Sequence, residues 1–282
     1  MSKIRVAVAL SGGVDSAVAA CILKEAGYEV IGMTMSLWSE ERRTCPSDDN
    51  IGDAENIFRT LGIPFHLIDL EHEFKRHVVD YFCREYARGR TPNPCIACNR
   101  SIKFGYLLDR AFSLGADFLA TGHYARVEHF DDSYHLLKGA DAAKDQSYML
   151  YTLGQEKLSQ LLFPLGQYTK SQVRELARQK GLPSAAKPSS QDICFIVSDY
   201  GTFLSRYINA APGDIVDSRH NLLGRHKGTA FYTVGQRHGL GLATTEPLYV
   251  TGIDTDKRRL IVGSKEELYG SHLTAADVNW VS

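Results

Sequence analysis

Cysteine side chains offer the most reactive chemistry in this sequence. Cys95 and Cys98 lie in the segment RTPNPCIACNR (90–100), and Cys194 begins an apolar run much later in the chain. A thiolate serves as a nucleophile or a metal ligand, and nearby cations lower the pKa of its thiol. Residues 84–104 hold five Lys or Arg against Glu85 alone, in a chain whose formal net charge is −1. This basic patch predicts lowered thiol pKa values and suits a phosphate backbone; a solvated, arginine-rich helix end is the alternative.

A glycine-rich turn marks a candidate nucleotide site. The apolar run IRVAVAL (4–10) leads into SGGVDS (11–16) and then into a helical pattern. Glycines let the backbone approach a ligand, and the N–H groups of a helix start attract anions. The turn fits neither G-x-x-x-x-G-K-[ST] nor G-x-G-x-x-G. It therefore predicts a pyrophosphate-binding loop of another kind.

Alternating strands and helices must hold these residues in place. We expect strands at 4–10, 28–38, 63–70 and 116–123, and helices at 15–27, 51–62, about 72–88 and about 101–114. The two prolines of the segment 90–100 predict a loop around its cysteines. A hairpin is expected over 125–139, and helical patterns return in 144–154, 156–166 and 169–181. Strand–helix repetition predicts a parallel sheet covered on both faces, with ligands at the carboxyl ends of its strands.

The amino-acid composition of the sequence changes after about residue 209. The rest of the chain is rich in glycine, threonine and short β-type runs, which predicts a small, mostly β domain. We therefore expect one domain over 1–208 and a second over 209–282, as a length of 282 residues also suggests. With 44% hydrophobic and 23% charged residues and no transmembrane-length apolar run, a cytoplasmic globular protein is predicted. In such a protein, clustered cysteines indicate metal or redox chemistry.

Five motifs, in this order and spacing, resemble those of the tRNA-specific 2-thiouridylases, a family of PP-loop ATP pyrophosphatases. They are SGGVDS, TPNPCIACNRSIKFG (91–105), ATGHYAR (120–126), KDQSYML (144–150) and SSQDICFI (189–196). The stretch HKGTAFYTVGQRHGLGL is similar to the central domain of that family. The resemblance implies a Rossmann-like α/β domain followed by a small β domain. It also implies ATP-dependent 2-thiolation of the wobble uridine, position 34, of tRNA, with release of AMP and pyrophosphate.

The resemblance implies roles for individual residues. The residues expected to hold ATP, with Mg²⁺, are Ala9, Leu10, Ser11, Gly12, Gly13, Val14, Asp15, Ser16, Met35 and Gly122. Those expected to contact tRNA are Asn93, Pro94 and Cys95, near the target base, and His123, Lys144, Asp145 and Gln146. Cys98 matches the catalytic nucleophile, and Cys194 matches the catalytic cysteine that carries a persulfide. A persulfide carrier protein or sulfide is expected to donate the sulfur.

This chain departs from the family pattern in two places. Many members have an aspartate where Cys95 stands, and Cys95, Cys98 and Cys194 together would suit a 4Fe–4S cluster with one open iron. That cluster is the alternative to a persulfide on Cys194 followed by a Cys98–Cys194 disulfide; zinc is less suited, because a structural site takes four ligands. Members also usually continue past a point like Ser282 into a C-terminal β-barrel that helps to bind tRNA, and we expect that barrel to be absent here.

Two other functions stay open from the sequence. One is a PP-loop enzyme that adenylates a different carbonyl, and the other is a non-catalytic tRNA-binding module with a structural metal site. Release of AMP in the presence of tRNA would separate an enzyme from a binding module. Among the remaining cysteines, Cys21 and Cys83 are expected to be buried core residues, and Cys45 has no predicted role.

Overall fold

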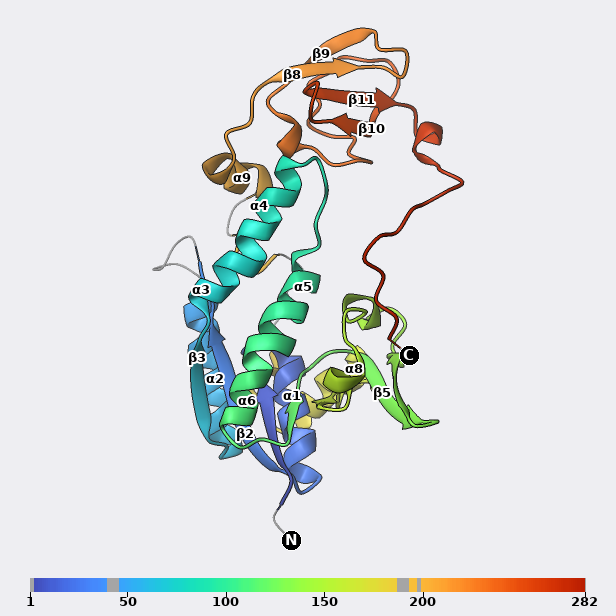
Figure 1. The fold of residues 1–282 in the computed structure, drawn as a ribbon. Coiled ribbons are helices and arrows are strands. Elements are labelled where there is room, and N and C mark those ends of the chain that lie inside the picture. Colours follow the sequence, from blue (N-terminus) through green and yellow to red (C-terminus); the bar gives the residue numbers. More distant parts are fainter. Residues whose placement is uncertain (1–2, 40–45, 187–192, 197–198, 282) are drawn as a thin grey trace. The chain divides into compact units, whose positions relative to one another are not determined.

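The computed structural model describes residues 3–39, 46–186, 193–196 and 199–281. The chain forms two compact units, which we describe separately (Figure 1). The first comprises residues 1–78, 95–195 and 279–282, and the second comprises residues 79–94 and 196–278. A domain boundary after residue 208 stays a prediction. Cys45 lies outside the described residues.

A parallel sheet forms the centre of the first unit. Among the described residues its five strands follow the order β3-β2-β1-β4-β7. Their bounds are β1 Arg5–Ala9, β2 Glu29–Ser36, β3 Phe65–Asp69, β4 Phe118–Ala120 and β7 Leu161–Leu162. Every neighbouring pair is parallel. The predicted α/β fold is confirmed.

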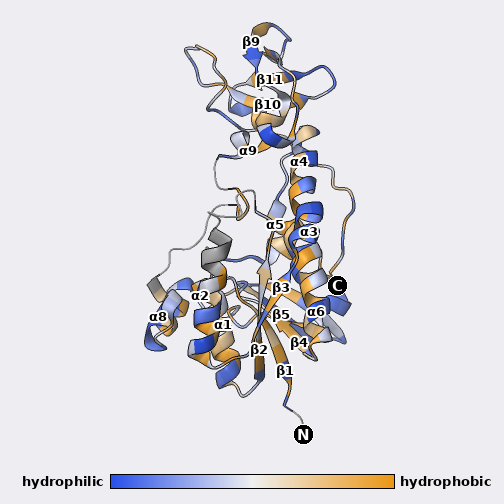
Figure 2. Ribbon diagram, turned by 90° about the vertical axis from the view of Figure 1, so that its left-hand side faces the viewer, coloured by the Kyte–Doolittle hydropathy of each residue, from blue (hydrophilic) through white to orange (hydrophobic). Residues whose placement is uncertain are grey.

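The strand order places the helices on the two faces of this sheet. From β1 the chain steps through α1 (Val14–Glu25) to β2 and through α2 (Pro46–Leu61) to β3. It then crosses back to β4, on the other side of β1, through α3 (Glu71–Phe74), η1 (Lys75–Val79), α4 (Asp80–Ala87), α5 (Pro94–Ala97), η2 (Cys98–Leu107) and α6 (Leu108–Ser113). Right-handed crossovers in opposite directions put their helices on opposite faces. Figure 2 shows α1 and α2 on one side of the strands and α6 on the other.

Apolar strand residues explain why this sheet is buried. Val6, Ala7 and Val8 of β1 have no exposed surface, as expected of a central parallel strand. At Gly32 of β2 an added Cβ would lie 1.4 Å from the ring of Phe58. The glycine therefore makes room for an aromatic ring from α2 against the strand.

Two local predictions were wrong. Cys95 and Cys98 lie on the helical segments α5 and η2, not in a loop. Proline is tolerated in the first turn of a helix, where its missing N–H has no partner to lose, and Pro94 begins α5. Leu161–Leu162 forms the edge strand β7 within a stretch predicted to be helical.

The hairpin and the helix over 169–181 are confirmed, whereas the helix predicted over 144–154 is reduced to the three-residue 3₁₀ turn Ser147–Met149. β5 (Ala125–Phe130) and β6 (Ser133–Lys138) form the antiparallel hairpin. Next come η3 (Ser147–Met149), the short α7 (Gln155–Leu158), α8 (Lys170–Gln179) and η4 (Pro183–Ala186). Helix α8 starts with the predicted capping box, in which Thr169 and Gln172 bond reciprocally.

The second unit is mostly β, as predicted. Besides α4 it contains α9 (Tyr200–Tyr207), η5 (Thr229–Phe231), η6 (Glu266–Leu268), β8 (Gly213–Val216), β9 (Leu222–His226), β10 (Tyr249–Asp254) and β11 (Arg259–Gly263). Within the described ranges the four strands form one sheet in the order β10-β11-β8-β9. Its core includes Ile215, Val250, Leu260 and Val262. Among the described helices, none is both long and apolar enough to span a bilayer.

Candidate active site

The SGGVDS turn joins the carboxyl end of β1 to the start of α1. Gly12 adopts φ +71°, a left-handed conformation that favours glycine. The N–H of Ser11 donates to the Ser16 hydroxyl at 3.2 Å, and that hydroxyl donates to the carbonyl of Gly13 at 3.2 Å. Gly13 is the N-cap of α1 and supplies no side-chain cap to its first N–H groups. The turn thus presents helix-start N–H donors where an anion can bind.

Gly122 forms the wall behind this turn. It follows β4, the strand beside β1, and a Cβ at position 122 would lie 2.8 Å from both the carbonyl carbon of Asp15 and the amide nitrogen of Ser16. We call SGGVDS (11–16) the phosphate loop and residues 121–123 the TGH turn. Only glycine at position 122 lets the TGH turn pack directly on the backbone of the phosphate loop. Met35 lies near the end of β2, the other neighbour of β1. Of these two predicted ATP residues, Met35 thus lies in one strand that flanks the loop, and Gly122 lies just after the other.

Two side chains that were given no role in the sequence analysis contact Asp15. The ammonium of Lys170 lies 2.6 and 2.7 Å from the two carboxylate oxygens of Asp15. The Tyr124 hydroxyl donates to one of those oxygens at 2.7 Å. Burial, followed by the bond to Asp15, raises the pKa of Tyr124. The phosphate loop is therefore tied both to the segment after β4 and to the start of α8.

The KDQ motif (144–146) holds the backbone at Tyr124 in place. The Gln146 side-chain oxygen accepts from the N–H of Tyr124 at 3.0 Å, and the N–H of Gln146 donates to the Tyr124 carbonyl at 2.9 Å. Asp145 accepts from the N–H of Gly139 and from the hydroxyl of Ser147. Burial alone would raise the pKa of Asp145, but these hydrogen bonds outweigh it and lower the pKa. Lys144 is exposed.

The cysteines of the predicted sulfur chemistry lie in the first unit. Cys98 is buried, whereas Cys95 is exposed. Burial raises the pKa of the Cys98 thiol more than the charge of Lys103 lowers it. The prediction of lowered thiol pKa values was thus wrong for Cys98, because its desolvation outweighs the basic neighbours.

Cys194 lies within electrostatic range of the other two cysteines. Residue 194 as a whole is exposed, but protein atoms around the thiol make burial the largest cause that raises its pKa, to about 12, followed by Cys98 and Cys95. No disulfide joins the five cysteines that the structure describes.

The described residues give no ready-made metal site. Nowhere among them are three His, Cys, Asp or Glu side chains arranged to hold a metal ion. As placed, Cys95, Cys98 and Cys194 do not fit a 4Fe–4S cluster. The cluster stays a prediction, and the chemistry proposed below uses the thiols alone.

His123 lies in an aromatic enclosure beside these elements. Its side chain packs against the rings of Phe104 and Phe163, and its Nδ1 is 2.6 Å from the Thr121 hydroxyl. Burial, followed by the charge of Lys103, lowers the pKa of His123 well below its usual value. The imidazole is therefore neutral at pH 7, and its predicted contact with tRNA would be as a neutral side chain.

Family models match both parts of this chain. Residues 4–198 match the model described as the tRNA methyl transferase HUP domain, and residues 201–264 match the tRNA methyl transferase PRC-barrel domain. The tRNA-specific 2-thiouridylase MnmA of Geobacter metallireducens is 52% identical over 98% of this chain and 79% of its own length. The chain belongs to the tRNA-specific 2-thiouridylase family. The namesake from Clostridium perfringens is 44% identical over all of this chain and 81% of its own length.

One more distant similarity is to a solved structure. The U34-tRNA thiolase NcsA from Methanococcus maripaludis, solved with its [4Fe-4S] cluster, has a TM-score of 0.46 and 22% identity over 73% of this chain and 66% of that one. The five-motif resemblance is confirmed by the relatives, and with it the assignment to ATP-dependent enzymes that thiolate tRNA.

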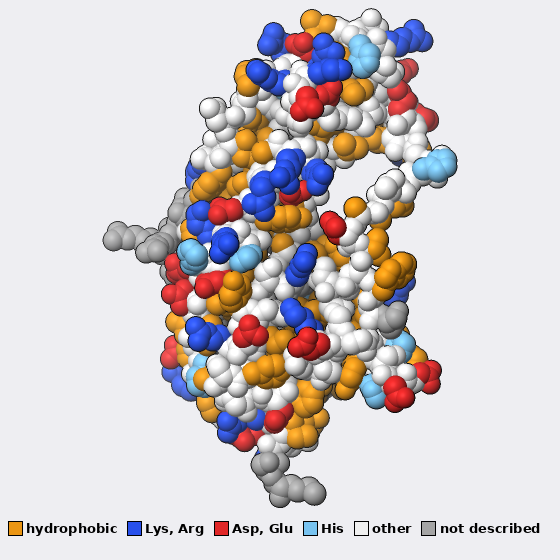
Figure 3. Space-filling view, in the orientation of Figure 1, with side chains coloured by type: hydrophobic (Ala, Val, Ile, Leu, Met, Phe, Trp, Pro, Cys, Tyr) orange, Lys and Arg blue, Asp and Glu red, His pale blue; other side chains and the backbone are white. Residues whose placement is uncertain are grey.

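The basic patch of this thiouridylase-family chain is partly neutralised. Figure 3 shows Lys and Arg side chains gathered over α4. Arg88 and Arg90 both pair with Glu85, at 3.2 and 3.4 Å. These two arginines are mostly exposed, so a polyanion can compete with Glu85 for them. Asn93 and Pro94 follow on the same segment of the second unit.

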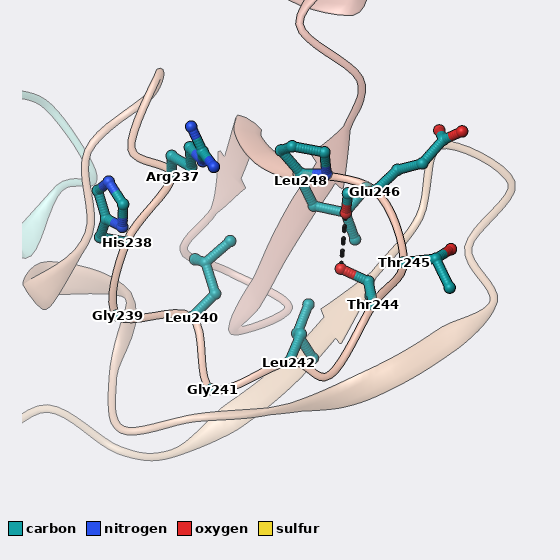
Figure 4. A pocket seen from close by; sticks show the side chains of 11 residues that line it. Arg237, His238, Gly239, Leu240, Gly241, Leu242, Thr244, Thr245, Glu246 and Leu248 are labelled. Carbon is teal, nitrogen blue, oxygen red and sulfur yellow. Dashed lines mark hydrogen bonds between the residues drawn. The ribbon is translucent and has the colours of Figure 1, made fainter.

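The family's HGLGL stretch lines a pocket in the second unit (Figure 4). Its volume is about 340 Å³, and it is bounded by residues 237–242 and 244–248. Gly239 and Gly241 have positive φ values, and the Thr244 hydroxyl donates to the carbonyl of Glu246 at 2.7 Å. None of the residues predicted for ATP, tRNA or sulfur chemistry lines this pocket.

The structure thus brings together part of the predicted site. The phosphate loop, Gly122 and the KDQ motif form one connected arrangement through Tyr124 and Asp15. The sequence analysis gave no role to Tyr124, which lies inside the ATGHYAR motif, or to Lys170, which follows the Thr169 cap. Each residue lies beside a local motif, but neither motif indicates a contact with Asp15, which is distant in sequence.

Proposed function

We propose that this chain catalyses ATP-dependent 2-thiolation of the wobble uridine of tRNA. The observation that carries the proposal is that one compact unit holds both an anion-binding turn and three thiols within electrostatic range of one another. Adenylation needs the first, and sulfur transfer needs the second. The relatives named tRNA-specific 2-thiouridylase support the same reaction. Such a reaction belongs in the cytoplasm, where tRNA is modified.

The phosphate loop serves the first step. The oxygen on carbon 2 of uridine attacks the α-phosphorus of ATP, the bond to the β-phosphate oxygen breaks, and pyrophosphate leaves with that electron pair. The N–H groups at the start of α1 stabilise the charge that develops on pyrophosphate. Mg²⁺ would arrive with ATP, and Asp15 is the carboxylate of the loop that suits a hard cation.

The thiols serve the second step. The terminal sulfur of a persulfide on Cys194 attacks carbon 2, and AMP leaves with the former carbonyl oxygen. The Cys98 thiolate then attacks the Cys194 sulfur, so that 2-thiouridine is released and a Cys98–Cys194 disulfide forms. A sulfane sulfur donor reloads the cysteine after a dithiol reductant has supplied two electrons. Because burial raises both thiol pKa values, Cys98 must lose its proton as it attacks, and Cys194 must lose its proton when the sulfur donor loads it.

The tRNA contacts remain part of this proposal. Asn93, Pro94 and Cys95 would lie near the target uridine, and exposed Lys144 would pair with a phosphate. Asp145 and Gln146 already bond to the protein backbone, so they would act by holding the KDQ segment in shape. His123 would contact tRNA only after a local movement, because it is 7% exposed. The target base must leave the anticodon stack to be reached.

The test is a product analysis with matched RNA substrates. The chain is incubated with ATP, Mg²⁺, a persulfide donor and a tRNA transcript with uridine 34, and a transcript with cytidine 34 serves as the control. We expect AMP, pyrophosphate and 2-thiouridine in equal amounts with the first transcript and none above background with the second. AMP release without 2-thiouridine would indicate adenylation of another carbonyl. No AMP with either transcript would leave only a binding module and contradict the proposal.

A further inference from the structure

Two lysine–carboxylate pairs join the same two helices. At one end, Lys170 of α8 pairs with Asp15 of α1. At the other end, Lys180, the C-cap of α8, pairs with Glu25, the last residue of α1. The two pairs are alike in chemistry and in the elements they connect. They differ in how exposed their side chains are and in which end of α8 holds the lysine. These two differences indicate a structural role for Lys180 and a functional role for Lys170.

The Lys180–Glu25 pair has the features of a structural tie. Its side chains are 39% and 53% exposed, so water screens the attraction, and such pairs contribute little to stability. A lysine at the C-terminal end of a helix also interacts favourably with the helix dipole.

The Lys170–Asp15 pair is placed unfavourably for a structural tie. Lys170 is the first residue of α8, where the positive end of the helix dipole repels a cation. Its side chain is only 13% exposed, and desolvation of a charge commonly costs as much as the pair gains. An apolar side chain would join the helices at lower cost. The position therefore calls for a positive charge at the phosphate loop.

The ammonium of Lys170 has capacity to bind more than Asp15. A lysine ammonium has three N–H donors. Of the described side chains, the carboxylate of Asp15 is the one acceptor that the structure gives it, through both oxygens. Asp15 lies between Gly13, the N-cap, and Ser16, whose hydroxyl closes the loop. A polyanion on this loop would therefore reach the ammonium as well.

We propose that Lys170 is an ATP-positioning residue. Its ammonium pairs with Asp15 when no nucleotide is bound, and it binds the pyrophosphate portion of ATP when ATP occupies the loop. Tyr124, which donates to Asp15 at 2.7 Å, keeps a partner on the carboxylate when Lys170 turns toward phosphate. The inference rests on the proposed function only in taking ATP as the substrate. Thiolation of tRNA is not needed to test it.

The experiment compares Lys170→Met with Lys180→Met in the full chain. Each variant removes one cation from the α1–α8 contact, and the change in Tm reports the structural cost of each removal. Affinities for ATP, pyrophosphate and adenosine are measured by calorimetry, together with Tm. For Lys170→Met we expect affinity for ATP and pyrophosphate to fall about 10- to 100-fold and affinity for adenosine to stay within about twofold. Lys180→Met should bind all three as the unmodified chain does.

Two results would overturn the inference. One is equal ATP and pyrophosphate affinities in the two variants, and the other is a parallel loss of adenosine affinity in Lys170→Met, which would indicate a displaced helix. If Lys170→Met does not fold, Lys170→Gln keeps a hydrogen-bond donor for Asp15 and is judged by the same criteria. An unmodified chain that binds ATP but makes no 2-thiouridine would contradict the proposed function alone.

Discussion

Replacement of Gly122 by alanine should uncouple the phosphate loop from its supporting strand. The new Cβ would lie 2.8 Å from two backbone atoms of Asp15 and Ser16, and ordinary contact begins at 3.4 Å. The TGH turn and the loop must therefore separate by about 0.6 Å, the difference between these distances. Backbone on both sides makes the strain hard to relieve, so we expect an overpacking cost of about 1–3 kcal/mol.

The functional loss should exceed the loss of stability. A misplacement near 1 Å costs about 100-fold in rate when it shifts reacting groups, so kcat/KM for ATP should fall about 10- to 100-fold. Tm should fall by several degrees, at roughly 2–4 °C for each kcal/mol. Both quantities are measured on the full chain, by thermal unfolding and by AMP release with tRNA.

Gly52→Ala provides the matched control. Gly52 lies inside α2, and its added Cβ meets nothing within 4 Å. Alanine in a helix interior is favoured over glycine by up to about 1 kcal/mol, so Tm should stay or rise and activity should not change. If Gly122→Ala matched Gly52→Ala in both Tm and kcat/KM, close packing of the TGH turn on the loop would not be what shapes the site.

Three further predictions concern the thiol, the core and a helix cap. Because the pKa of Cys194 is raised to about 12, its alkylation by iodoacetamide should accelerate about tenfold per pH unit from pH 7 to 10, and a plateau below pH 9 would contradict this. Gly32→Ala places a Cβ 1.4 Å from the buried ring of Phe58, so urea unfolding should show a loss of about 3 kcal/mol or more; a loss below 1 kcal/mol would refute the packing. Thr169→Ala removes the hydroxyl that accepts from the N–H of Gln172 and should cost about 1 kcal/mol in the same assay, whereas no change would mean that the capping box is not maintained in solution.

Most strands of the sheet were predictable because each is a short apolar run in the sequence. The apolar run 4–10 gives β1 through burial on both faces, and glycine ends the helix before β2. The strand β7 was not predictable, since Leu161–Leu162 is only two residues long. Its apolar residues also fit a helical period. Pro94 misled the prediction because a proline that begins a helix looks the same in sequence as one that breaks it.

The site was predictable where one segment supplies all of its atoms. The SGGVDS turn holds its own glycines, hydroxyls and helix start. The Lys170–Asp15 pair depends on packing of α8 against α1, which no local pattern encodes. The thiol pKa values could not be inferred from nearby charge, because the extent of burial at Cys98 and Cys194 decides their direction.

The most direct test of sulfur transfer by these thiols is the yield of 2-thiouridine in single cysteine variants of the full chain. Cys98→Ala and Cys194→Ala should each bind ATP normally yet form no 2-thiouridine on a uridine 34 transcript with ATP and a persulfide donor. Cys21→Ala, which changes a buried thiol of α1 on the core side, should retain full activity. Formation of 2-thiouridine by either the Cys98 or the Cys194 variant at the rate of the unmodified chain would contradict the assigned chemistry.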